Sequence, residues 1–174
     1  MRVESPAFTE REMRGFLEEV TDHERRHLIE RLEAGSARLD KLAGAGFEQR
    51  PDGEHEWNAH DVLAHIVVLS KFYGMLTYQV GSGKVADVDL LANVKARDLA
   101  GEQLVRLSDT ELLRTAHSEH ERTIAFIRSA SPTAMQRRAT LYEGFSMSAL
   151  ELALLGLCSH LEIHLDQMEE ACRR

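Results

Sequence analysis

The chain has 174 residues, enough for one domain to bury its own core without disulfides or a structural metal. Its 21 basic and 29 acidic residues give a net charge of −8, which argues against a nucleic-acid partner because phosphate binding needs a basic surface. Only 3 prolines and 2 cysteines occur, a composition that disfavours disulfide-rich and turn-rich β classes. We therefore expect a single all-α domain over residues 1–174.

The apolar pattern also bears on where the protein works. The first residues, MRVESP, lack the apolar core of a signal peptide. No window approaches the ~20 apolar residues that a membrane span needs. We expect a cytoplasmic protein with no membrane partner.

Four capping patterns mark the starts of four long helices. In each pair, a polar side chain caps the backbone N–H of an acidic residue three positions on, and the acid reaches back. The pairs are Thr9 with Glu12, Asn58 with Asp61, Ser108 with Glu111, and Ser148 with Glu151. The apolar periods that follow predict a first helix that stops in the glycine-containing segment 43–46, and three more over about 59–80, 109–129 and 149 to near the end. The four are expected to match at roughly 20–24 residues.

Two local questions concern the first two helices. Thr21 and Glu24 form a second capping pair, so a break of the first helix near Val20 stays open. Trp57 and Val62 have the spacing of a hydrophobic staple at the start of the second helix.

The connections between the helices are unequal. Residues 81–107 form the longest one, and their apolar residues predict a short helix of its own. A crossover of this length along the bundle makes the second and third long helices parallel. We expect a four-helix bundle whose apolar stripes face one core.

Three of the nine histidines fall on apolar faces of two predicted helices. His160 and His164 share one face of the last helix, and His65 lies in the inward stripe of the second. A lone buried histidine is usually satisfied by a hydrogen bond, whereas one divalent ion can satisfy three neutral imidazoles together. The three histidines lie at the same height along the bundle axis only when these two helices run antiparallel, and the long crossover permits that direction. Imidazole ligands suit zinc, nickel or iron alike.

Other residues are candidates for supporting roles. Gln167 lies at the edge of the His164 face and is expected to orient a metal-bound nucleophile. His120 and Tyr73 are further candidate pocket residues, although a surface pair with His117 is the simpler interpretation of His120. Asp61 either holds the second nitrogen of His65 or serves only as a cap. The remaining candidates have simpler interpretations: His23 and His27 on a solvated face, His55 and His60 in a loop and first turn, and Cys158 as an inert packing thiol.

Two segments carry a family resemblance. Residues 57–66, WNAHDVLAHI, resemble the helix-two signature of the DinB/YfiT-like proteins, in which a Trp precedes a histidine-bearing helix. Residues 159–167, SHLEIHLDQ, resemble their helix-four His-x3-His-x2-Gln. The resemblance implies an up-down-down-up bundle, a divalent metal on His65, His160 and His164, and a homodimer.

The resemblance also implies a range of activities. Related bundles include metal-dependent transferases and isomerases that use low-molecular-weight thiols such as bacillithiol, mycothiol or glutathione. The mycothiol-dependent maleylpyruvate isomerases are expected to carry Glu where His160 stands, so the resemblance does not extend to that reaction.

Two functional hypotheses follow for a small-molecule substrate. In the first, a metal with an open position serves a thiol S-transferase or a hydrolase, with a low-molecular-weight thiol as a cosubstrate of the transferase. In the alternative, a non-catalytic bundle binds a small ligand or dimerises, with the metal structural or absent. Structural zinc usually has four protein ligands, so three inward histidines favour the enzyme. A fourth inward ligand from His120 or Gln167 would favour the alternative.

Overall fold

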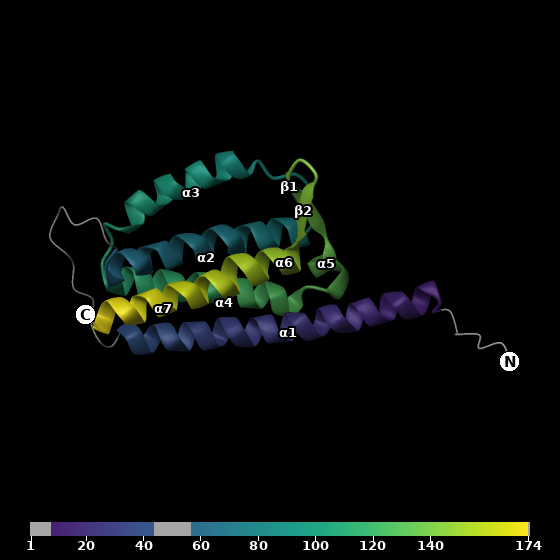
Figure 1. The fold of residues 1–174 in the computed structure, drawn as a ribbon, viewed down its shortest axis with the longest axis horizontal. Coiled ribbons are helices and arrows are strands. Elements are labelled where there is room, and N and C mark those ends of the chain that lie inside the picture. The colour runs from purple at the N-terminus through teal and green to yellow at the C-terminus, as the bar shows by residue number, and fades with distance from the viewer. Residues whose placement is uncertain (1–7, 44–56, 174) are drawn as a thin grey trace.

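The computed structural model describes residues 8–43 and 57–173. His55 and the glycines at 44 and 46, which are predicted to end the first helix, lie outside these residues. The described chain is mostly helical with one two-stranded hairpin, which confirms the all-α class (Figure 1). The elements in chain order are α1 (Glu10–Ala43), α2 (Ala59–Gly81), α3 (Leu90–Leu104), α4 (Asp109–Ser129), α5 (Pro132–Gln136), β1 (Arg138–Tyr142), β2 (Phe145–Ser148), α6 (Ala149–Ala153), the π-helical turn η1 (Leu154–Ser159) and α7 (His160–Arg173).

Among the described helices, none combines the length and the apolar character needed to cross a membrane.

All four predicted capping pairs form and set the starts of α1, α2, α4 and α6. The first helix does not break near Val20, since α1 is continuous through this point. The Thr21 hydroxyl does not cap a new helix there but donates within α1 to the carbonyl of Leu17 at 2.7 Å. At 34 residues, α1 is far longer than the other helices, so the prediction of four matched lengths is wrong.

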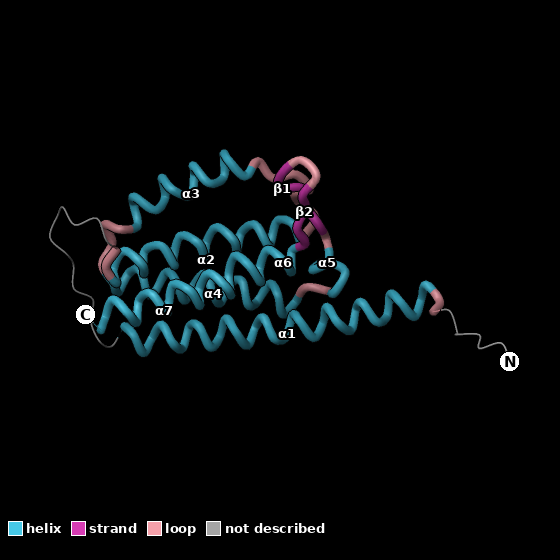
Figure 2. Tube along the Cα trace, in the orientation of Figure 1, coloured by secondary structure: helices cyan, strands magenta, loops and turns pink. Residues whose placement is uncertain are grey.

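The region predicted as a connection over 130–147 contains a hairpin that the sequence analysis missed. Strands β1 and β2 pair antiparallel with Arg138 opposite Ser148, and Gly144 makes their turn with a left-handed φ of 74°. The amide of Val88 donates to the carbonyl of Thr140, so the hairpin also holds the segment that leads into α3. Figure 2 shows the hairpin at the end of the bundle where α3 begins.

Helices α1 and α7 lie side by side and run in the same direction. The guanidinium of Arg31 binds Glu162 through two hydrogen bonds of 2.6 and 2.7 Å, and Arg38, two turns further on, reaches Asp166 and Glu169. Residue numbers therefore rise in the same direction on α1 and α7, as Figure 1 shows for the two helices. These pairs position the histidine-bearing face of α7.

Helices α2 and α4 are also parallel to each other. Ser70 of α2 forms a hydrogen bond with His120 of α4. Further along both helices, the ring centroid of Tyr78 lies 5.2 Å from that of Phe126. The second and third long helices thus run the same way, as the long crossover predicts.

The core lies where α1, α4 and α7 surround α2, which is buried on most of its circumference. The largest fully buried apolar side chains come from all four helices and from α5 and α6: Leu28, Leu32, Leu39, Leu63, Ile66, Leu112, Ile127, Met135, Leu152, Leu165 and Met168.

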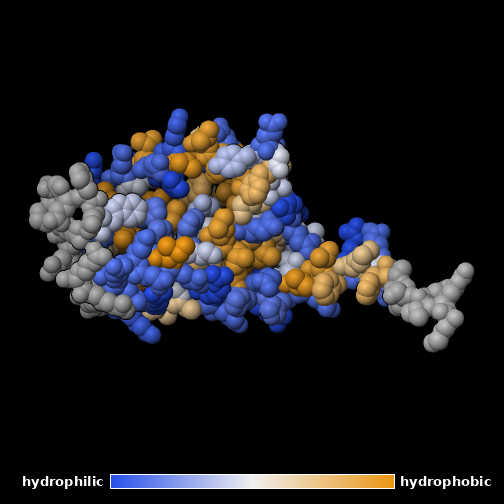
Figure 3. All heavy atoms as spheres, in the orientation of Figure 1, coloured by the Kyte–Doolittle hydropathy of each residue, from blue (hydrophilic) through white to orange (hydrophobic). Residues whose placement is uncertain are grey.

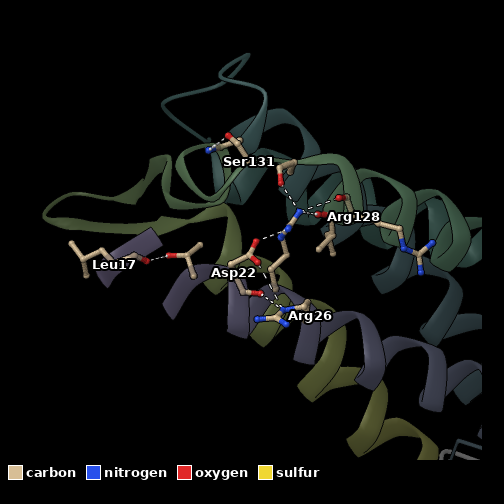
Figure 4. A network of polar contacts seen from close by, with 10 residues as sticks. Leu17, Asp22, Arg26, Arg128 and Ser131 are labelled. Atoms are coloured by element: carbon tan, nitrogen blue, oxygen red, sulfur yellow. Dashed lines mark hydrogen bonds and ion pairs between the residues drawn. The ribbon is translucent and has the colours of Figure 1, made fainter. Parts of the chain in front are cut away.

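A polar network at the end of α4 fastens that helix to α1. Arg25 donates to the backbone carbonyls of Ile127, Arg128 and Ala130 and is held by Asp22. A guanidinium at this place satisfies the carbonyls that a helix end leaves free and complements the helix dipole. Figure 4 shows the network between Asp22 on α1 and the chain around Arg128.

Helix α3 confirms the predicted short helix in the crossover but lies outside the core. It has no buried side chain, and Leu91 and Leu99 are mostly exposed. Figure 1 shows it running along α2 from the hairpin end to the start of α4. It is therefore positioned to cover whatever α2 presents on that side.

Candidate metal centre

Three imidazoles from α2 and α7 lie beside one another. The ring centroid of His65 is 4.6 Å from that of His164 in an edge-on contact, and His164 is 6.1 Å from His160. Further along α2, Tyr73 lies 5.6 Å from His160, so residue numbers rise on α2 as they fall on α7. The two helices therefore run antiparallel (Figure 1), which is the direction that brings the three histidines level.

The imidazoles lie at the edge of the core rather than inside it. The buried stripe of α7 is formed by Leu161, Leu165 and Met168, whereas His160 and His164 are only half-buried. The sequence predicts that His160 and His164 face the core, whereas the structure places them at its edge. Each histidine precedes a core leucine by one residue, a rotation of about 100° around the helix, which turns the imidazoles toward α2 and solvent.

A π-helical turn with a glycine precedes His160 and makes room for Tyr73. A Cβ atom added at Gly156 would lie 2.1 Å from Cδ1 of Tyr73, so the ring occupies the space of the missing side chain. Burial raises the pKa of the Tyr73 phenol, which keeps it protonated. The predicted pocket residue Tyr73 thus lies next to His160, and π turns are frequent at functional sites.

Gln167 contacts a histidine. Its amide oxygen accepts a hydrogen bond of 2.8 Å from Nδ1 of His164, and its own side chain is exposed. Because an amide oxygen only accepts, the His164 proton is on Nδ1 and the lone pair is on Nε2. This is the tautomer in which Nε2 can bind a metal.

The electrostatic environment keeps two of the imidazoles neutral. Burial, together with the neighbouring His164, lowers the pKa of His65 to about 4. Burial also lowers the pKa of His164 against the opposing effect of Gln167. Neutral imidazoles have the free lone pair that a metal ligand needs.

His160 has a buried nitrogen with no partner. Its Nδ1 is inaccessible to solvent and makes no hydrogen bond to a described residue. Buried polar atoms of native proteins are nearly always satisfied, so an unsatisfied one indicates a missing ligand, water or ion. In the part of the chain that the structure describes, however, no three His, Cys, Asp or Glu side chains are already arranged as a metal-ligating group. The donor set fits a divalent metal, and ligation requires the rings to rotate toward one point.

A cavity of about 580 Å³ opens beside His65 under α3. The ring centroid of Trp57 lies 4.7 Å from that of His65 and forms one wall of the cavity. The staple between Trp57 and Val62 stays a prediction. Asp61 also lines the cavity, but its carboxylate accepts from the Asn58 amide as a helix cap. Arg97, Asp98 and Glu102 of α3 complete the wall, and Arg97 is paired with Asp98.

His120 lies apart from the three histidines. It is 2% exposed, and its nitrogens meet the hydroxyls of Ser36 on α1 and Ser70 on α2. The interpretation of His120 as half of a surface pair is therefore wrong, although His117 is exposed enough to reach Asp40. With both nitrogens occupied, His120 links three helices of the core.

His60 was interpreted as a simple first-turn residue, but it is buried. Its ring bridges the Asp109 carboxylate and the Val105 carbonyl, which joins the starts of α2 and α4 to the end of α3. Sequence spacing offers no signal for such a contact, because its partners lie over 40 residues away. Cys158 is a buried packing thiol, as predicted, and burial raises its pKa to about 12.

Comparison with known proteins gives one result. A family model described as the DinB superfamily matches residues 31–168, which include the three histidines and Gln167. No curated protein and no solved structure matches the chain.

Proposed function

Because the chain belongs to the DinB superfamily, we propose that it binds a divalent metal ion through His65, His160 and His164. In this proposal the protein is an enzyme that acts on small molecules and uses the ion in catalysis. It is either an S-transferase for low-molecular-weight thiols or a hydrolase. The observation that carries the proposal is the cluster of three imidazoles from two helices, one with a buried, unsatisfied nitrogen. A divalent ion on three neutral ligands is a Lewis acid that lowers the pKa of a bound water or thiol.

The surrounding residues have defined roles in this proposal. Gln167 holds His164 in the ligating tautomer, which revises its expected role of orienting the nucleophile. The protonated Tyr73 phenol beside His160 donates a hydrogen bond to a substrate anion.

The proposal includes the up-down-down-up bundle. Three helix pairs support it: α1 with α7 and α2 with α4 are parallel, and α2 with α7 is antiparallel. This arrangement is required for the metal site, because the usual up-down-up-down order would separate His65 from the other two histidines.

The expected homodimer is also proposed, through the free end of α1. This end projects past the bundle, and Figure 3 shows apolar side chains along it. Met13, Phe16, Leu17 and Val20 form an exposed stripe with helical spacing. The proposed dimer pairs these apolar ends of two copies. Sedimentation is expected to show a dimer that Phe16→Asp converts to a monomer, and a monomeric wild type would contradict the pairing.

Metal analysis of protein purified without an affinity tag tests the site. We expect near-stoichiometric zinc, nickel or iron in the wild type and its loss in His65→Ala and His164→Ala. His23→Ala is the matched control, because His23 lies on an exposed part of α1 and should keep the metal. No bound metal in the wild type, or full occupancy in the site variants, would refute the proposal.

Activity is tested on the same proteins with thiols, small electrophiles and esters, with and without a chelator. Turnover that depends on the metal and on His164 supports the enzyme. Stoichiometric metal without turnover favours the non-catalytic alternative.

A further inference from the structure

A second cavity lies between α2 and α3, separate from the cavity beside His65. Its volume is about 360 Å³, within the usual range of small-molecule sites. Apolar side chains of both helices and of the segment after α3 form most of its wall: Val68, Phe72, Met75, Ala96, Ala100, Leu104 and Leu107.

The cavity exists because α3 does not fill the space above α2. No side chain of α3 is buried, and its lining residues include the small Ala96 and Ala100. The ends of the crossover are nevertheless fixed, by the Val88–Thr140 hydrogen bond at one end and by His60 at the other. A helix anchored at its ends and lined with small residues leaves room for a ligand along its middle.

The polar groups of this cavity are cationic or neutral. Lys71 and Arg97 line it together with Asn93 and Gln103, and none of its lining residues is acidic. Lys71 forms no hydrogen bond or ion pair with any residue in the described segments. The Arg97 charge is partly compensated by Asp98, which lies outside this cavity, whereas the positive charge of Lys71 is uncompensated among the described residues. An apolar wall with these two cations is complementary to an apolar anion.

Arg97 retains unused donors. It is 23% exposed, and it binds the Asp98 carboxylate through Nε and Nη2 at 3.0 and 2.8 Å. Its Nη1 makes no hydrogen bond to a described residue, and a guanidinium is suited to planar carboxylates. Arg97 and Val68 line the cavity beside His65 as well, so they form the boundary between the two cavities.

We propose that the α2–α3 cavity binds a small apolar carboxylate, whose anionic group is held by Arg97 and Lys71 and whose apolar part lies against Phe72 and Leu104. The carboxylate is held where the two cavities meet. For the enzyme proposed above, on which this step rests, the substrate class is therefore a small apolar carboxylate. Binding itself needs no metal, so it can be tested independently of the metal centre.

The test uses 4-phenylbutyrate and octanoate as probes, each compared with its neutral amide by titration calorimetry in a chelator. We expect wild-type protein to bind each acid about tenfold more tightly than its amide, the effect of one charge-assisted hydrogen bond. Arg97→Met should lose most of this preference and Lys71→Met part of it. Lys95→Met removes an exposed charge from the same helix and should keep the preference.

The outcomes separate this site from the metal centre. Failure of the wild type to bind either acid, or an acid preference that survives in Arg97→Met, overturns the inference. A folded Arg97→Met variant, verified by circular dichroism, makes that comparison valid. If metal analysis fails while the acid preference depends on Arg97, only the proposed metal function is lost. His164→Ala should keep the acid preference in either case.

Discussion

The aromatic ring of Tyr73 on α2 occupies the space that a side chain at position 156 would need. A Cβ atom there would lie 2.1 and 2.2 Å from Cδ1 and Cγ of the ring, far inside van der Waals contact. Gly156 lies in the π turn directly before His160. The contact therefore sets how closely the histidine-bearing helix approaches α2.

Gly156→Ala is expected to destabilise the protein by about 1–3 kcal/mol, because the rigid ring of Tyr73 must move. Urea unfolding measures this change, and Tyr73→Leu in the same chain should recover part of it. Gly15→Ala is the control: it lies in α1 with no atom near its Cβ, and it should stabilise by about 0.5–1 kcal/mol. Equal stability of Gly156→Ala and wild type would contradict the close contact.

Gln167→Leu is expected to weaken metal affinity by about 10–100-fold, because Nδ1 of His164 loses its acceptor and the ligating tautomer is no longer favoured. Competition with a chromogenic chelator measures the affinity. Gln167→Glu retains an acceptor and should bind metal far better than Gln167→Leu. Equal affinities of the two variants would show that this hydrogen bond does not orient the ligand.

His60 should make stability fall at alkaline pH. Burial lowers its pKa, but hydrogen bonds to Asp109 and the Val105 carbonyl outweigh burial and raise it above the ordinary value. Both partners accept, so the bridge requires the protonated ring. Its contribution is complete below the unfolded pKa of about 6.5 and is lost as pH rises through the folded pKa.

Unfolding by urea on both sides of that range measures the effect. The stability difference between wild type and His60→Gln should shrink as pH rises from about 6 to 9, since only the histidine gives up a proton. A constant difference would mean that the ring is neutral in the folded protein.

His120 should have the opposite dependence on pH. Burial lowers its pKa to about 4, so the folded protein excludes a proton that the unfolded chain binds below about 6.5. Stability should therefore fall by up to about 3 kcal/mol as pH falls through this window. His120→Gln retains a donor and an acceptor for Ser36 and Ser70 and should be less sensitive to acid. Equal acid sensitivity would place the cause at other groups.

The helix starts and the family were predictable from short stretches of sequence. A capping pair such as Ser108 with Glu111 acts over three residues, so its signal is complete within them. The same holds for the His160–His164 spacing on one helix face. The crossover helix was predictable from the length and apolar residues of the connection, whereas the antiparallel approach of α2 to α7 was predicted only as the condition under which the three histidines lie level.

Contacts between distant segments were not predictable in this way. The hairpin in residues 138–148, the π turn and the depth of His120 depend on what packs against them. His60 and His120 have similar local sequence surroundings to exposed histidines, and only their partners Asp109, Ser36 and Ser70 distinguish them.

The sequence by itself determined that this protein is a bundle of long helices and that His160 and His164 share one helix face, because caps, apolar periods and i, i+4 spacing are local properties of a helix. The tertiary structure alone decided that His65, His160 and His164 lie at the edge of the core and that Gln167 holds His164. It also decided that a cavity under α3 opens beside His65. These features depend on the rotation and separation of packed helices, which side chains far apart in the chain set together.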